Sequence, residues 1–167
     1  MLSVIAKLLK VLNSDDNPAQ LALAVVFALI MGLTPLMSPH NILILLLVLF
    51  VRVNLGFFIV SFGLFSGLAY LLDPLSNQLG ATVLHSEGLQ TLWTGLYQAS
   101  FWRFIGYNNT LIMGSVCLSL IMAIPLYLAV IWALTRYRDK VRAKIAQSRL
   151  ALLVKGTSLF KLYAALN

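Results

Sequence analysis

Ionisable side chains are scarce in this sequence. Charged residues make up 10% of its 167 positions, and it has five carboxylates, two histidines and one cysteine. The nearest approach to a catalytic cluster is His85-Ser86-Glu87, but sequence neighbours point in different directions and a third partner is lacking. No metal-ligand spacing, phosphate-binding glycine loop or nucleophile elbow is found. The sequence therefore favours a non-catalytic protein that needs no metal or cofactor.

Apolar residues dominate instead. They make up 60% of the chain, and the mean hydropathy of +0.92 lies outside the soluble globular range. The net charge of +7 does not indicate nucleic-acid binding, because eight of the twelve Lys and Arg residues follow Trp132, at the end of an apolar segment. That clustering is the positive-inside signal. We therefore expect one all-α integral membrane domain.

A polar, helix-breaking stretch interrupts the first apolar region. Pro35 and Pro39 each remove a backbone donor and disfavour helix in the residue before them, so one helix should end near Gly32 and another begin near Asn41. In lipid the freed backbone groups must find protein or water partners. The stretch therefore predicts a protein-lined or water-reached elbow at membrane depth.

The apolar runs on either side of the elbow are short. Asp15, Asp16 and Asn17 before Pro18 predict a capped helix start. The run 19–33 has fifteen residues and the run 42–51 has ten, and at ~1.5 Å per residue neither comfortably crosses a core of about 30 Å. We expect residues 18–52 to form a broken, re-entrant hairpin of half-helices. Two short spanning helices are the alternative.

The elbow has two interpretations. In the first, Ser38, His40 and Asn41 cap the second half-helix. Alternatively, the positive N-terminus of that half-helix faces a water-filled cavity and meets an anion or a lipid headgroup. Arg52 and Asn54 are boundary anchors, or lie at a lipid phosphate if the hairpin re-enters. The candidate lipid or anion site comprises Thr34, Pro35, Ser38, Pro39, His40, Asn41, Arg52 and Asn54.

Two longer apolar segments follow. Residues 55–72 provide eighteen positions, enough for one crossing that ends at Asp73-Pro74, and residues 108–135 give a second span of ~42 Å, kinked at Pro125. Residues 73–107 between them are polar and aromatic and should lie along the outer interface. Small residues permit close helix approach, so the faces formed by Gly63, Gly67, Ser115, Ser119 and Ala123 are expected to pack on each other or on a partner.

Both ends of the chain have an amphipathic pattern. Residues 1–17 predict an interfacial helix rather than a signal peptide, because lysines interrupt a short apolar part and no small-residue cleavage site follows. Residues 136–167 predict a basic tail on the anionic inner leaflet. Its first cations are Arg136, Arg138, Lys140, Arg142 and Lys144. With Arg103 the lone cation of the outer segment, the charge distribution places both termini in the cytoplasm.

The order of these features resembles small bacterial inner-membrane proteins of the domain of unknown function 2062 family. The shared features are Pro18 opening a helix, Gly32 followed by Pro35, a leucine run, Arg52-Val53-Asn54, and a glycine-bearing span ending at Asp73-Pro74. The family commonly has asparagine where this chain has Asp73. The whole length looks like a short Gram-negative subgroup, encoded beside a larger envelope protein, and related domains are joined to glycosyltransferases acting on lipid-linked sugars. The resemblance thus implies lipid-linked envelope work rather than a particular activity.

Two functional hypotheses follow. In the first, the protein is a non-catalytic inner-membrane subunit that binds membrane lipids, docks a larger envelope protein and assists lipid handling or transfer. In the second, it is a homo-oligomeric transporter or channel for a small solute or anion, with the elbow as its filter, because one chain has too few helices to enclose a pore. A purely structural, membrane-shaping protein is a third alternative.

Overall fold

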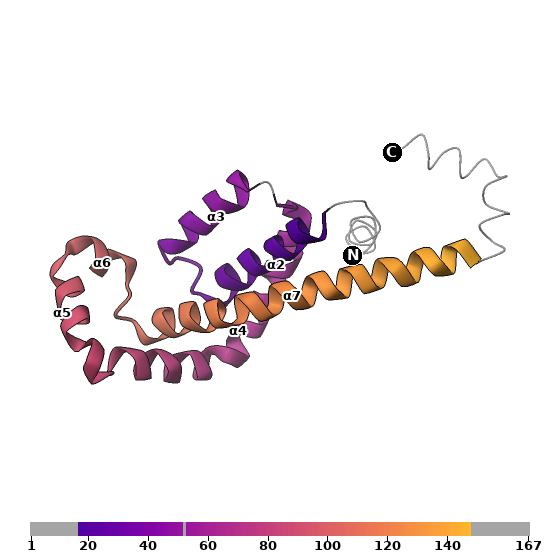
Figure 1. Cartoon of the computed structure of the whole chain (residues 1–167). Coiled ribbons are helices and arrows are strands. Elements are labelled where there is room, and N and C mark those ends of the chain that lie inside the picture. The colour runs from indigo at the N-terminus through magenta and orange to yellow at the C-terminus, as the bar shows by residue number, and fades with distance from the viewer. Residues whose placement is uncertain (1–16, 52, 148–167) are drawn as a thin grey trace. The chain divides into compact units, whose positions relative to one another are not determined.

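The computed structural model describes residues 17–51 and 53–147, with side chains up to Lys140. Every regular element in these ranges is a helix (Figure 1). The elements are α2 (Pro18–Leu33), α3 (His40–Phe50), α4 (Leu55–Leu84), the short 3-10 helix η1 (Glu87–Leu89), α5 (Gln90–Gln98), α6 (Ser100–Ile105) and α7 (Thr110–Gln147). The all-α expectation is confirmed for this part of the chain. The predicted N-terminal helix and the end of the basic tail lie outside the described residues.

The expected break between two short helices is present. Asn17 caps α2, its Oδ1 accepting a hydrogen bond from the Ala19 amide at 3.0 Å, and Pro18 occupies the first turn. Helix α2 ends at Leu33 and α3 begins at His40, with the chain reversing direction between them (Figure 1). Pro35 and Pro39 both lie between the two helices. Neither has a backbone N–H, so a helix that continued through this stretch would lose a hydrogen-bond donor at each.

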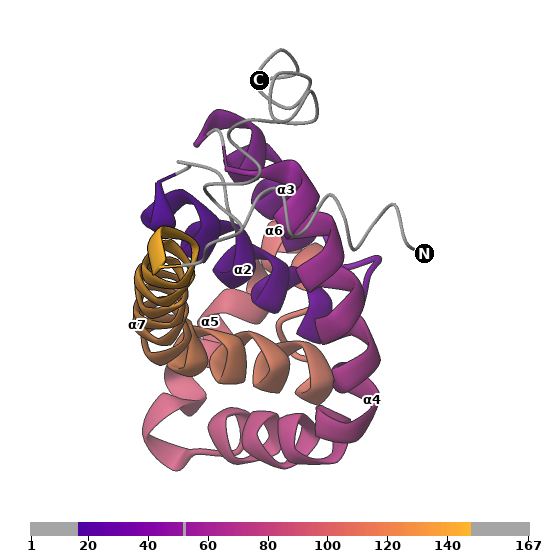
Figure 2. The same ribbon diagram turned by 90° about the vertical axis from the view of Figure 1, so that its right-hand side faces the viewer.

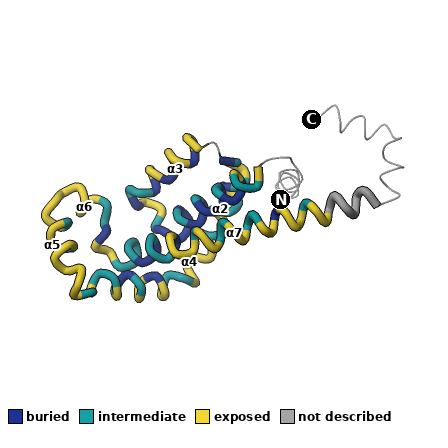
Figure 3. The backbone as a smooth tube through the Cα atoms, viewed as in Figure 1, coloured by how far each residue is buried: buried dark blue, intermediate teal, exposed yellow. Residues whose placement is uncertain are grey.

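Helix α2 is the most buried element of the described chain (Figure 3). It packs on α3 and more extensively on α4. The apolar cluster they share contains Ala24, Ala28, Met31, Ile44, Val48, Val53 and Phe58. At Gly32 an added Cβ would come within 2.7 Å of the Phe65 Cβ and 3.1 Å of the Ser66 amide nitrogen, so glycine permits the close approach of α2 to α4. This approach fixes the end of α2 beside the middle of α4.

Helix α4 is longer than the sequence indicated. The expectation that Asp73-Pro74 ends the span is wrong, because the helix continues through Pro74 to Leu84. Its ribbon bends sharply within its length (Figure 2). Pro74 has no N–H to donate to the carbonyl of Tyr70 four residues earlier, and its ring crowds the preceding turn, which bends a helix without necessarily ending it. Residues 75–84, expected to belong to the outer interfacial segment, form the second arm of α4.

The close helix contact made by small residues is not the one predicted. An added Cβ at Gly63 or Gly67 would meet nothing within 4 Å, so this face of α4 is open. Instead, a Cβ at Gly80 would collide with backbone of Thr110 and Gly114 in α7. The Thr110 hydroxyl donates to the Asn77 Oδ1 at 2.9 Å across the same crossing. Within the described chain the Gly63/Gly67 face therefore does not pack on α7, where Gly80 makes the close contact instead, and packing of that face on a partner stays a prediction.

Aromatic side chains organise the segment between α4 and α7. The Trp93 and Tyr107 rings stack with their centres 5.9 Å apart, and the Trp93 Nε1 donates to the Val83 carbonyl at 3.2 Å. The Tyr107 hydroxyl donates to the Trp93 carbonyl at 2.8 Å. These bonds tie α5 to the end of α4, and the residues just before α7 to α5.

Helix α7 begins as the sequence indicated. The Asn109 Oδ1 accepts from the Leu111 and Ile112 amides at 2.9 and 3.2 Å, and Pro125 lies inside the helix. Among the described residues, Leu55–Leu84 and Thr110–Lys140 are long and apolar enough to cross a membrane. Only 6% of the most apolar window in each is buried. Most of the apolar surface of these two helices is therefore not covered by other parts of the described chain.

Candidate functional site

Two side chains close the elbow between α2 and α3. The Asn41 Nδ2 donates to the carbonyls of Pro35 and Leu36 at 3.1 and 3.3 Å. The Thr34 hydroxyl lies 3.0 Å from the Asn41 Oδ1 and 2.9 Å from the Ile30 carbonyl, and its one hydrogen serves either acceptor. Thr34 and Asn41 are 5% and 2% exposed. The elbow thus satisfies its own freed backbone carbonyls from within the protein.

This arrangement replaces the predicted cap of α3. The residue preceding α3 is Pro39, and no side chain makes a capping hydrogen bond there, so the interpretation of Ser38, His40 and Asn41 as caps is wrong. Asn41 points back to the elbow because two carbonyls need its donors. The Oγ of Ser38 and the Nε2 of His40 are buried without a hydrogen-bond partner among the described residues. Six of the predicted site residues therefore lie together at the elbow: Thr34, Pro35, Ser38, Pro39, His40 and Asn41.

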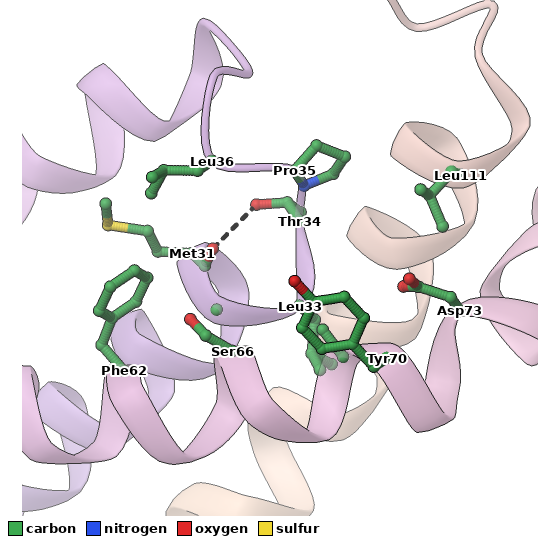
Figure 4. A pocket seen from close by; sticks show the side chains of 12 residues that line it. Met31, Leu33, Thr34, Pro35, Leu36, Phe62, Ser66, Tyr70, Asp73 and Leu111 are labelled. Atoms are coloured by element: carbon green, nitrogen blue, oxygen red, sulfur yellow. Dashed lines mark hydrogen bonds between the residues drawn. The ribbon is translucent and has the colours of Figure 1, made fainter.

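A pocket of about 470 Å³ opens beside the elbow (Figure 4). Its walls come from the end of α2, the elbow, α4 and the start of α7. The lining residues are Met31, Gly32, Leu33, Thr34, Pro35, Leu36, Phe62, Ser66, Ala69, Tyr70, Asp73 and Leu111. Leu33 and Thr34 are buried, whereas Tyr70 and Leu36 at the rim are 81% and 57% exposed. The pocket is thus an apolar cleft open on one side, with few polar groups and no basic one in its lining.

Asp73 is the site residue that the sequence reasoning missed. It was interpreted as a helix terminator, whereas it stands inside α4 and its carboxylate points into the pocket (Figure 4). The available signal was a carboxylate within a long apolar segment, since an ionisable group at membrane depth marks a functional site by default. The sequence does not show this role, because Pro74 predicts the end of the apolar span at Asp73.

The remaining candidates of the predicted lipid or anion site lie elsewhere. Arg52 falls outside the described residues. The Asn54 side chain accepts from the Phe57 amide at 3.0 Å and caps α4, as expected of a boundary residue. The eleven residues of α3 separate Asn54 from the elbow by ~16 Å along the helix. The structure therefore does not bring Asn54 into the elbow region.

The other predicted surfaces have mixed outcomes. The hydroxyls of Ser115 and Ser119 are buried and donate within their own helix, to the carbonyls of Ile112 and Val116 at 3.1 and 2.9 Å. Ala123 is half-buried. From Trp132 onward α7 belongs to a separate structural unit, in which Arg136 and Lys140 are exposed and Arg138 is half-buried. The side chains of Arg142 and Lys144 lie outside the described residues.

The short polar run at the end of α4 forms no catalytic arrangement. The Nδ1 of His85 lies 2.8 Å from the carbonyl oxygen of Ala81 and must donate to it, because a carbonyl only accepts. Glu87 begins η1 and is exposed. Within the described ranges, no group of three His, Cys, Asp or Glu side chains is placed to hold a metal ion.

Comparison with known proteins gives a family. Residues 3–143 match the family model of uncharacterized proteins conserved in bacteria, DUF2062. An uncharacterized protein of Treponema pallidum (strain Nichols) is 29% identical over 161 residues, covering 96% of this chain and 99% of that protein. No solved structure matches the chain. Because the family match covers most of its length, the chain belongs to the DUF2062 family.

Proposed function

We propose that this protein is a non-catalytic subunit of the bacterial inner membrane that accommodates lipid beside a re-entrant hairpin and docks a larger envelope protein. Membrane insertion is supported by the unburied apolar faces of α4 and α7, where Ile59, Leu71 and Ile124 are 63%, 76% and 71% exposed. Water would oppose exposure of such large contiguous apolar faces, whereas lipid would not. The cluster of cations after Trp132 supports cytoplasmic termini.

The hairpin supports re-entry through its lengths and its polar bonds. Helices α2 and α3 have 16 and 11 residues and so extend ~24 and ~16 Å, less than a hydrocarbon core of about 30 Å. Non-helical backbone at membrane depth is tolerated where the protein supplies its partners. Asn41 supplies two of those partners within the elbow. We propose that the hairpin enters and leaves on the cytoplasmic side.

The observation that carries lipid handling is the pocket at the elbow. A pocket of about 470 Å³ holds part of an amphiphile, and its walls are almost wholly apolar. It lies where a broken helix pair would perturb the bilayer. A lipid that enters this pocket would be drawn out of regular bilayer packing, which is the step that a transfer subunit must assist.

Docking is supported by the open glycine face of α4. Gly63 and Gly67 have free space where other helices could approach, and Leu64 beside them is 62% exposed. Because this chain does not cover the face, a single-span partner could pack against it closely. The charge pattern, lacking carboxylate clusters, supports a structural rather than a catalytic role.

A pull-down from native membranes tests this proposal. The chain is purified in nanodiscs or gentle detergent, and co-purifying proteins and lipids are identified by mass spectrometry. We expect a stoichiometric envelope protein and enriched phospholipid or lipid-linked intermediates. Gly63→Leu with Gly67→Leu should abolish the protein association, whereas the matched exposed changes Ile121→Leu and Ile124→Leu should not. An association that survives the glycine changes would remove the structural basis for docking.

A homo-oligomeric transporter is the second candidate, favoured by the unpartnered Ser38 Oγ and His40 Nε2 at the elbow. A solute or anion could supply the missing partners. This alternative expects His40→Ala to change solute flux in liposomes. It also expects the purified chain to form an oligomer without another protein. A monomer without flux would eliminate it.

A further inference from the structure

The carboxylate of Asp73 has no protein partner in the described structure. It is half-buried in the pocket wall, and no hydrogen bond or ion pair joins it to another described residue. The lining contains no Lys, Arg or His that could neutralise it. A carboxylate held in an apolar cleft without a counter-charge is costly, so its natural complement is a cation that arrives with a ligand.

The same turn of α4 offers further acceptors. Pro74 provides no N–H for the carbonyl of Tyr70, so that carbonyl lacks its usual helical donor. The Tyr70 hydroxyl and the Asp73 carboxylate both point into the pocket (Figure 4). A phosphate or other anion would find no basic partner here. A group with several N–H donors and a positive charge would find complementary acceptors.

The opposite end of the pocket is apolar. Met31, Leu36 and Phe62 lie at the end remote from Asp73 (Figure 4). A bare metal ion would not use this apolar part and would need several oxygen ligands, whereas an amphiphile fits both ends. A primary ammonium group suits the polar end better than a quaternary one, because only the primary group donates hydrogen bonds.

We propose that this pocket binds a phospholipid whose headgroup carries a primary ammonium, with Asp73 as the counter-ion. The Tyr70 hydroxyl accepts a second hydrogen bond from the ammonium, and an acyl chain lies along Met31, Leu36 and Phe62. The lipid phosphate stays outside the pocket, since the lining has no cation to meet it. This assignment rests on the proposed lipid-handling function and specifies its lipid class.

Lipid retention measured by native mass spectrometry tests the assignment. The full chain is placed in nanodiscs of equal parts phosphatidylethanolamine, phosphatidylglycerol and phosphatidylcholine, and the lipids retained on release are counted. We expect one phosphatidylethanolamine per wild-type chain, in preference to the other two lipids. Asp73→Asn should reduce its retention by about tenfold, as expected for loss of a charge-assisted hydrogen bond. The matched control Glu87→Gln removes an exposed carboxylate and should leave retention unchanged.

A second variant separates the pocket from the charge. Ala69→Phe keeps the carboxylate but fills part of the pocket, so it should also lose phosphatidylethanolamine, even if Asp73→Asn did not fold. Equal retention of all three lipids by the wild type, or unchanged retention in both variants, would overturn the assignment. If the native pull-down still yields an envelope protein and enriched lipid, that failure concerns only the headgroup class. If neither experiment shows any specific lipid, the lipid-handling proposal fails as well.

Discussion

Replacing Asn41 by alanine should destabilise the protein only through the hydrogen bonds that are lost at the elbow. The Asn41 amide donates to two backbone carbonyls, those of Pro35 and Leu36, and its oxygen lies 3.0 Å from the Thr34 hydroxyl. Alanine would remove this donor from both carbonyls in a site where the side chain is 2% exposed, although the Pro35 carbonyl also accepts from the Ser38 amide at 2.9 Å. The Thr34 hydroxyl would keep a partner, because the Ile30 carbonyl lies 2.9 Å from it.

The expected cost follows from these bonds. Each lost hydrogen bond removes about 1 kcal/mol net, and a buried acceptor left unpaired costs about 1–3 kcal/mol. The Pro35 carbonyl keeps the Ser38 amide as a donor at 2.9 Å, so only the Leu36 carbonyl loses this donor without a replacement among the described residues, and we take the low end of the cost for it. The free energy of unfolding should then fall by about 2–3 kcal/mol. The control should remove the same number of side-chain hydrogen bonds at an exposed position.

Asn109→Ala is that control. It also removes two hydrogen bonds, those that the Asn109 Oδ1 accepts from Leu111 and Ile112, but Asn109 is exposed and water can replace it. Loss of such a cap costs about 1 kcal/mol. Reversible unfolding in mixed micelles, followed by far-UV circular dichroism, gives both values. If Asn41→Ala proved no more costly than Asn109→Ala, the elbow would not depend on buried side-chain bonds and our account of it would be refuted.

Three further predictions concern helix contacts and caps. Gly80→Ala should lower the free energy of unfolding by up to ~3 kcal/mol, because its Cβ would collide with the backbone of α7. Gly63→Ala should raise the free energy of unfolding by about 0.5–1 kcal/mol in the isolated chain. Thermal unfolding in detergent compares the two variants. A double-mutant cycle of Thr34→Val and Asn41→Ala should show a coupling of about 1 kcal/mol, and strict additivity would contradict their contact. Asn17→Ala should cost about 1 kcal/mol, measured by the same unfolding assay, because the Ala19 amide loses its cap.

Helix boundaries governed by local chemistry were predictable from the sequence. Asn17 before Pro18 and Asn109 before the last helix act as caps whose partners lie within three residues. Pro35 and Pro39 likewise located the break, because a missing donor is a property of the residue itself. The sequence therefore indicated both ends of α2 and α3 and the start of α7 to within a residue or two, whereas α7 continues to Gln147, beyond the expected end of the span at residue 135.

Contacts between distant elements were not predictable in the same way. The Gly63/Gly67 spacing is a good close-packing pattern, but Gly80 and Gly114 make the observed contact, and only the path of the chain decides which glycines meet. The direction of the Asn41 side chain also depends on carbonyls that become free only when the elbow folds. Proline in a helix may end it or bend it, and packing decides between the two, as at Pro74.

Two prolines that interrupt helical hydrogen bonding, Pro35 in the elbow and Pro74 within α4, lie at or next to residues of the same pocket. Pro35 lines the pocket, and Pro74 follows Asp73 and withholds a donor from Tyr70. At the elbow the carbonyls have partners within the protein, since Asn41 donates to those of Pro35 and Leu36 and the Thr34 hydroxyl lies 3.3 Å from that of Met31. The second removes the usual helical donor from the Tyr70 carbonyl, in the same turn as the Asp73 carboxylate on the pocket wall. A protein that needed only stability would gain from pairing these acceptors with donors of its own. Acceptors left beside an open apolar pocket therefore favour a ligand that brings the donors itself.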